Sequence, residues 1–361
     1  GSIVGNVDVN SGATLGGTGT VGDASSTVTI KSGGTLSPGN SPGTLTVAGN
    51  LALNSGSTTV FELGQAGVPG GASNDLVKVG GNLTLGGALQ ANVASAGWYR
   101  LFNYGGTQTG SFSSVNVNGS GGFAPLAGAG TVQLGTPGQV NLAVLGAGQS
   151  TQFWKGSTSS IWDAVTSNWA NGTPTGAPGS WAGSVGVFGS YAGVTLGTVT
   201  VQGGQLFDTL QFSANGYNIA AATGANAGSL NIAPASGNAG TINTDAGISA
   251  SISAPIGDGT GNQLVKVGDG TLTLSGGSTY TGGTLINGGT LVAASTGTTG
   301  SALGTGAVAV NGAGSTLQVN NGTTVGNAVS LNGGALDNAG NLMVAGLAVH
   351  GLAGTPVTVN N

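Results

Sequence analysis

Short alternations of apolar and polar residues recur along the chain. In Leu83–Leu85, Val265–Val267 and Leu272–Leu274, two apolar side chains flank one small or polar residue. This period of two predicts short β-strands with one buried face. Asn-Gly and Gly-Gly pairs such as Asn321-Gly322 follow within a few residues, and glycine supplies the positive φ of sharp turns. The pattern predicts an all-β chain.

A Gly-Gly-x-Leu step gives these strands a longer repeat. The leucine anchors near the C-terminus, of which Leu291 and Leu336 close such a step, are spaced by 19, 26 and 19 residues, at Leu272, Leu291, Leu317 and Leu336. An interval near twenty residues, made of strands and turns, predicts the coils of a parallel β-solenoid, because one coil cannot bury its own apolar face. We expect the four leucines to form one inward column. A β-sandwich or barrel array is the alternative, and it predicts antiparallel hairpins instead.

Composition narrows the classes of function. Charged residues make up 4% of the 361 residues, and the net charge is −5. So few charges exclude a basic nucleic-acid binder, a coiled coil and a charged disordered tail. The chain has no cysteine, which excludes disulfides, thiolate metal sites and thiol nucleophiles. We therefore expect no nucleic-acid partner and no cofactor.

Aromatic residues gather near the middle of the sequence. Ten of the 18 lie between Phe153 and Tyr217, including Trp154, Trp162, Trp169 and Trp181. Exposed tryptophans stack on sugar rings or anchor protein partners, which makes these four our candidates for a partner-binding or glycan-binding site. The alternative is that they fill the core of a broader subdomain, because each can bury a large apolar area.

The sequence offers little catalytic chemistry. Asn243-Thr244-Asp245 superficially resembles the Asn-Thr-Asp of pectin-hydrolysing β-helical enzymes, but no second acid adjoins it. Glycoside hydrolysis needs two nearby carboxylates, so we interpret this motif as a solvent-facing turn. A Ser-His-Asp triad would depend on His350, which we interpret as an exposed strand histidine. We expect no enzyme activity, and the alternative is a β-helical carbohydrate-active enzyme or carbohydrate-binding module.

Metal-binding patterns are equally sparse. The acidic turns Asp258–Asn262 and Asp269-Gly270 lack both the EF-hand spacing and tandem calcium-binding coils. They leave room only for loose contact with Ca²⁺.

Several segments resemble one family of proteins. Residues 264–292 resemble the autotransporter-associated β-strand repeat nearly residue for residue, including its centre at 279–284. Weaker matches are the Ser-Pro-Gly-Asn-Ser-Pro-Gly step within 36–45, the aromatic segment 97–112, and Trp162-Asp163 with Asn168-Trp169. On these motifs the chain resembles the passenger domain of a Gram-negative autotransporter of the type V secretion class.

The resemblance implies a right-handed parallel β-helix with a Trp-rich elaboration near its middle. It also implies export to the cell surface, attached to or secreted from the outer membrane. There the segment would act as a rigid, non-catalytic stalk for adhesion or display and would aid its own export. The expected partner is a host or matrix surface protein or glycan. Such proteins contact the membrane through a C-terminal barrel, which we do not find in this sequence.

Two further expectations concern organisation. We expect residues 1–145 to be the C-terminal part of one module, 146–152 a junction, and 153–361 the next module. In the latter, 153–217 is the Trp-rich opening and 218–361 holds the repeat coils. Unpaired strand edges at the ends of a solenoid also predict end-to-end self-association.

Overall fold

A computed structural model describes most of the chain as two compact units, residues 1–147 and 148–361. This division falls inside the predicted junction 146–152. The described residues form short β-strands and one 3₁₀ helix, Gly224–Asn226. They are residues 2–40, 42–122, 124–125, 130–134, 138–146, 149–234, 239–259, 261–294, 301–312, 314–338, 341–342, 345–350 and 358–360.

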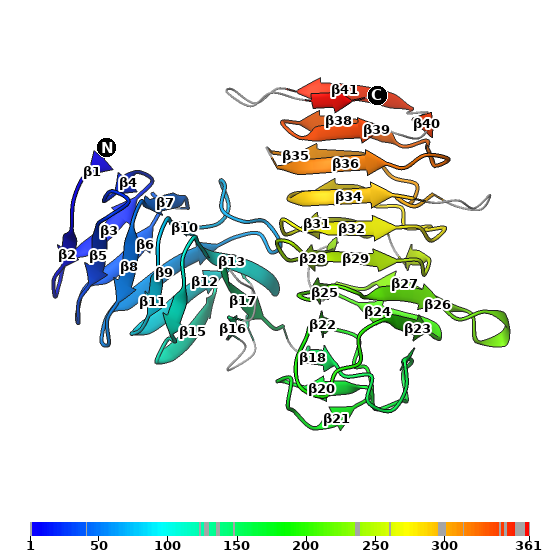
Figure 1. Ribbon diagram of the computed structural model, residues 1–361, viewed down its shortest axis with the longest axis horizontal. Helices are drawn as coiled ribbons and strands as arrows, with labels where there is room; N and C mark the ends of the chain where they lie inside the picture. The colour runs from blue at the N-terminus through cyan, green and yellow to red at the C-terminus, as the bar shows by residue number, and fades with distance from the viewer. Residues whose placement is uncertain are drawn as a thin grey trace. The chain divides into compact units, whose positions relative to one another are not determined.

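The described strands of the first unit form three sheets (Figure 1). The first contains, in spatial order, β1 (Ser2–Ile3), β4 (Thr20–Val21), β7 (Thr44–Val47), β10 (Leu76–Val79), β13 (Gly97–Tyr104), β17 (Gln139–Val144) and β16 (Gly130–Gln133). The second contains β14 (Gln108–Gly110), β11 (Leu83–Leu85), β8 (Asn50–Leu53), β5 (Thr27–Ile30) and β2 (Val7–Val9). The third contains β15 (Ser114–Gly119), β12 (Ala88–Val93), β9 (Thr58–Leu63), β6 (Thr35–Pro38) and β3 (Thr14–Gly17).

The second unit has two long sheets and two short ones among its described strands. The first long sheet contains β21 (Pro178–Gly179), β20 (Trp169–Asn171), β18 (Thr151–Trp154), β22 (Val185–Phe188), β25 (Thr209–Phe212), β28 (Ala239–Thr244), β31 (Gln263–Val267), β33 (Thr284–Ile286), β35 (Val308–Asn311), β38 (Ala328–Asn332) and β41 (Gly346–His350). The other contains β19 (Ile161–Trp162), β23 (Thr198–Val201), β26 (Asn218–Ala221), β29 (Ser249–Ile252), β32 (Thr271–Leu274), β34 (Gly289–Ala293), β36 (Ser315–Val319), β39 (Ala335–Asn338) and β42 (Thr358–Asn360). The short sheets are β24 (Gly203–Phe207), β27 (Gly228–Ile232) and β30 (Ile256–Asp258), and β37 (Thr324–Val325) with β40 (Asn341–Leu342).

Successive coils pair in parallel, as the repeat predicts. Leu272 pairs with Leu291, Leu291 with Leu317, and Leu317 with Leu336. All four side chains are fully buried, so the predicted inward column is confirmed. The coils of the first unit pair in parallel in the same way, as β10 does with β7 and β12 with β9. Both units are therefore parallel β-helices, which excludes the sandwich or barrel alternative for them.

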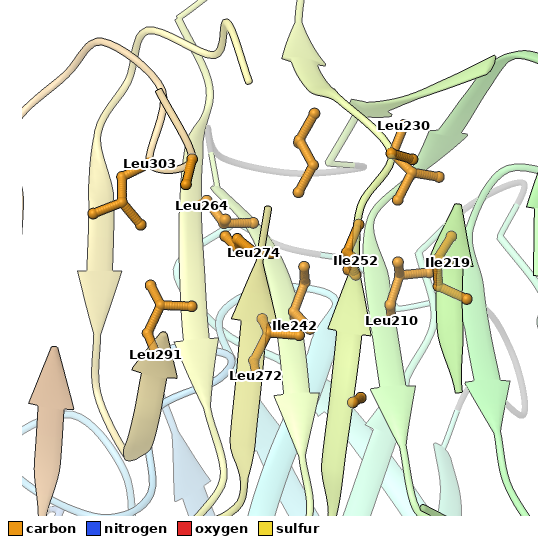
Figure 2. Packing of buried hydrophobic residues seen from close by; sticks show 14 of the residues in the cluster. Leu210, Ile219, Leu230, Ile242, Ile252, Leu264, Leu272, Leu274, Leu291 and Leu303 are labelled. Carbon is orange, nitrogen blue, oxygen red and sulfur yellow. The ribbon is translucent and has the colours of Figure 1, made fainter. Parts of the chain in front are cut away.

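The interior is filled by aliphatic side chains that alternate with outward polar residues. Figure 2 shows Ile242, Leu272 and Leu291 among the side chains that fill the space between the strands. Strand β32, for example, alternates half-buried threonines with buried leucines. The turns allow equally close stacking, because Gly289 has a φ of 61° and a Cβ there would collide with the carbonyl oxygen of Gly270. This explains the second glycine of the Gly-Gly-x-Leu step.

Coil length varies more than the sequence repeat suggests. Bonds between neighbouring coils span 19 residues from Gln263 to Gly282, 21 from Asn6 to Thr27, and 34 from Asn215 to Ser249. The extra residues lie in corners and loops, where insertion does not disturb the ladder register. The parallel ladder of the second unit also begins at Thr151, before the predicted start of the repeat coils at residue 218.

Antiparallel pairs mark where the spiral stops. At the end of the first unit, β17 pairs antiparallel with both β13 and β16. At the start of the second, β20 pairs antiparallel with both β18 and β21. The parallel ladder of each unit therefore ends in an antiparallel cap where the chain passes from one unit to the next. A cap that reverses chain direction replaces the missing neighbour of a terminal coil.

Candidate functional site

The four predicted binding tryptophans lie together in the core of the second unit. Trp154, Trp162 and Trp169 have at most 1% of their surface exposed, and Trp181 has 7%. The ring centroids of Trp169 and Trp181 are 4.4 Å apart, and those of Trp162 lie 5.2 Å from Trp169 and 5.1 Å from Trp181. Phe188 joins them from β22 and stacks on Phe212 of the next coil at 5.0 Å. Such edge-to-face and offset contacts add to the free energy gained by burial.

Local polar contacts fix the loop that carries two of these rings. Asn168 is fully buried, and its Oδ1 accepts the backbone N–H groups of Thr158 and Ser159 at 3.0 and 3.1 Å. Its Nδ2 donates to the carbonyl oxygen of Ile161 at 2.7 Å and to the hydroxyl of Ser159. Asn168 therefore holds the segment between Trp162 and Trp169 in one conformation, because each of its polar atoms has a partner.

A glycine lets the rings pack directly on a strand. A Cβ on Gly186 in β22 would lie 3.1 Å from the indole rings of both Trp169 and Trp181. The aromatic cluster therefore packs directly against a strand position that has no side chain.

The burial of all four tryptophans corrects their interpretation as an exposed stacking surface. A sugar ring needs an accessible aromatic face, whereas these faces are covered by one another and by Phe188. The packing alternative accounts for them.

Asn243-Thr244-Asp245, which resembles a catalytic motif in sequence, is part of the buried structure. Asp245 is 1% exposed, so our interpretation of this motif as a solvent-facing turn is wrong. The carboxylate accepts from Gln211 Nε2 at 3.2 and 3.3 Å and from Asn243 Nδ2 at 3.0 Å. Buried against amides, it is inaccessible to a polysaccharide substrate.

The other candidate chemical groups are dispersed. His350 lies on β41 and is exposed, as expected. Within the described ranges, no three His, Asp or Glu side chains gather closely enough to hold a metal ion. In the same ranges, no helix has the length and apolar character needed to cross a membrane.

A buried lysine is the feature that sequence reasoning missed. Lys266 occupies an inward position, between Ile242 and Ile286 of the neighbouring coils. Its ammonium donates to the carbonyl oxygens of Val267 and Gly268 at 2.8 Å and of Gly288 at 3.1 Å. Burial lowers the pKa of Lys266 to about 7, although the negative charges of nearby aspartates oppose this shift. The alternation around Val265–Val267 predicted a strand. It did not predict that three backbone carbonyl oxygens would surround the Lys266 ammonium.

Two of the hollows on the surface of the second unit are lined by described residues of its coils. One, of about 420 Å³, is lined by small and aliphatic side chains of β35, β38 and β41, such as Ala309 and Ala348. The other, of about 450 Å³, lies beside β24, β27 and β30 and combines Leu206 with the polar residues Asn231 and Asp258. Asp258 and Asn262, which both line it, had stood out in sequence only as an acidic turn.

Comparison with known proteins agrees with this architecture. Residues 264–293 match the passenger-associated-transport-repeat family. The chain is also 35% identical over 303 residues to the adhesin BmaC autotransporter of Brucella suis biovar 1 (strain 1330). The aligned region covers 74% of this chain and 8% of that protein. The chain thus spans a small part of that relative's length. No solved structure matches it.

The matched repeat is an integral part of the stack. It comprises β31 to β34, which continue the parallel ladders of β28 and β29 without a break in register. The resemblance stated from residues 264–292 is therefore confirmed. The transport repeat, the β-helix around it and the adhesin match identify the chain as autotransporter passenger sequence, a surface-exposed protein translocated through the outer membrane.

Proposed function

We propose that the chain is a non-catalytic part of an adhesive passenger, which binds a host or matrix surface protein or glycan. The observation that carries this proposal is the unbroken inward column from Leu272 to Leu336. A stack in which each coil pairs with the next is stiff along its axis and presents a long lateral surface. The relative that it matches is named an adhesin.

The absence of catalysis is part of the proposal. Asp245, the best candidate from sequence, is buried and engaged by Gln211 and Asn243. Incubation of the purified chain with pectin and other polysaccharides is expected to release no reducing ends. Release that disappears in Asp245→Asn, which removes the charge and keeps the size of the side chain, would overturn this part.

Adhesion can be tested directly. Beads coated with the purified chain should bind epithelial cells and at least one component of a matrix-protein and glycan array. Soluble chain should compete with the beads. Failure to bind any cell type or array component would contradict the adhesive role.

A role of the transport repeat in export needs a control for stability. Tyr280, inside the repeat, is fully buried, and its hydroxyl is 2.7 Å from Thr284 Oγ1. Phe212, outside the repeat, is equally buried. Tyr280→Leu and Phe212→Leu should destabilise the folded chain similarly, since each loses a core ring.

In the cell that makes the protein, Tyr280→Leu should reduce surface display more than Phe212→Leu. Display can be measured by protease accessibility on intact cells. Equal display of the two variants would contradict a specific export function of the repeat.

We also infer that copies of this chain associate end to end. Leu347 and Val349 on β41 continue two inward columns, yet they are 44% and 51% exposed. Light scattering should show oligomers that grow with concentration and are lost in Val349→Lys. Val165→Lys, at an 80% exposed position elsewhere, is the control. A monomer at all concentrations would contradict the inference.

A further inference from the structure

The mixed hollow of about 450 Å³ beside β24, β27 and β30 has the features of a small-ligand site. Its walls combine the aliphatic groups of Leu206, Ala233 and Pro234 with the polar side chains of Asn231 and Asp258. The volume lies in the range of natural ligand pockets, which pair apolar walls with a few placed polar groups. The geometry points to a saccharide subsite, which rests on the proposed adhesive function and names its ligand class.

The ladder register brings residues of three coils together at this hollow. Leu206 pairs with Asn231, and Asn231 pairs with Gly257, so these positions form one outward column across three coils. The side chains in this column shrink from leucine to asparagine to none. A Cβ on Gly257 would lie 2.9 Å from Asn231 Oδ1, so the Asn231 amide lies over this bare position, and Leu206 and Asp258 line the hollow beside it.

The polar groups are held in place and present acceptors. Asp258 Oδ2 accepts the backbone N–H of Thr281 at 3.0 Å and its hydroxyl at 3.1 Å, while Oδ1 has no hydrogen-bond donor among the described residues. Asn262 Nδ2 donates to the carbonyl oxygen of Ile232 at 2.9 Å, and Asn231 Nδ2 reaches Ser229 Oγ at 3.4 Å. The side-chain oxygens of Asp258, Asn231 and Asn262 therefore remain as acceptors for a ligand that supplies donors.

The aliphatic wall is also fixed. Leu206 is 52% exposed, a large apolar side chain facing solvent. Its carbonyl oxygen accepts the indole N–H of Trp181 at 2.7 Å. The buried tryptophan cluster thereby anchors the strand that carries Leu206. Among the four tryptophans singled out from sequence, Trp181 contributes to this site as a positioning residue.

These features select a class of ligand. A sugar ring presents C–H groups on one face, which fit Leu206 and Pro234, and hydroxyl donors at its edge, which fit the three acceptors. The Asp258 carboxylate disfavours sulfated or sialylated sugars through like-charge repulsion. A neutral hexose or N-acetylhexosamine residue of a glycan fits the hollow best.

The test uses the whole chain and defined sugars. Saturation-transfer NMR with the methyl glycosides of glucose, galactose, N-acetylglucosamine and N-acetylgalactosamine, each at about 20 mM, should show contact with at least one. Leu206→Ala and Asp258→Asn should each weaken that sugar's binding at least about fivefold. Leu196→Ala, 46% exposed elsewhere, and Asp8→Asn, an exposed carboxylate in the first unit, should leave it unchanged. Circular dichroism verifies the fold of each variant.

Several outcomes would overturn the subsite. The first is that none of the four sugars contacts the protein, and the second is that the hollow variants bind as well as their controls. The third is that the chemical shifts of the protein respond to CaCl₂ and to none of the sugars. The bead-adhesion assay separates these failures from failure of adhesion itself. Wild-type beads that bind cells while no sugar enters this hollow would leave the adhesive function in place and reject only the subsite.

Discussion

The Trp-rich cap and the transport-repeat coils of the second unit share a ladder but have different interiors. In the coils, most inward positions hold an aliphatic side chain, as in the column from Leu272 to Leu336, and Lys266 and Tyr280 are exceptions. In the cap, Trp162 and Trp169 fill the same kind of space with rings. A middle coil has a neighbour on both sides, whereas the first coil has one neighbour and an open end. Large rings cover that end because each buries more apolar area than an aliphatic side chain.

The cap of the first unit shows which part of this solution is general. There β17 returns antiparallel on β13 and buries Val140, Leu142 and Val144. It contributes no tryptophan. Reversal of the chain is thus common to both caps, and so are buried rings, since β13 buries Trp98 and Phe102 under β17. The cluster of four tryptophans belongs to the second cap.

Removal of one tryptophan ring from the cap of the second unit is expected to have the largest effect. Trp162→Ala should lower the free energy of unfolding by about 3–5 kcal/mol, since Trp162 is fully buried against three other aromatic rings. Urea denaturation of the second unit measures this loss. Trp162→Phe should recover part of it. A loss below about 1 kcal/mol would show that the cap does not stabilise the stack.

An interior leucine should cost less and act locally. Leu291→Ala should destabilise by about 2–4 kcal/mol. Hydrogen exchange should speed up chiefly in the paired strands β32 and β36, because each coil contacts only its neighbours. Uniform loss of protection across the unit would contradict this nearest-neighbour behaviour.

The pH dependence of stability shows what a buried charge at Lys266 costs the aliphatic interior. The folded pKa of Lys266, about 7, lies below the ordinary value of 10.5, so the unfolded chain binds more protons between these values. Stability should therefore rise by about 2 kcal/mol from pH 7 to pH 9 and stay low below pH 7. Lys266→Met should abolish this rise. A wild-type protein equally stable at both pH values would contradict the depressed pKa.

The smallest expected effect concerns the bare strand position under the cap. Gly186→Ala should cost about 1–2 kcal/mol, because the new methyl group would press on Trp169 and Trp181. Gly346→Ala, where a Cβ meets nothing within 4 Å, is the control. Thermal unfolding of both variants gives the comparison, and equal midpoints would show that the rings adjust without cost.

Much of the candidate site lay beyond the sequence. The acidic turn from Asp258 to Asn262 was visible as a motif, but the hollow also needs Leu206 and Asn231 from two earlier coils. Their meeting depends on register between coils of unequal length. The burial of Asp245 likewise depends on Gln211, which lies 34 residues earlier. No local pattern encodes such separations.

By itself, the sequence determined the local structure and the way it repeats. Alternation selects one face of a strand, Gly-Gly steps select turns, and the recurring leucines select a parallel stack, because these depend on neighbouring residues and a repeated interval. Only the tertiary structure decided which tryptophans are core, where Lys266 lies, and where the spiral is capped. Burial is set by the number of coils packed against a position, and that number is a property of the assembled stack.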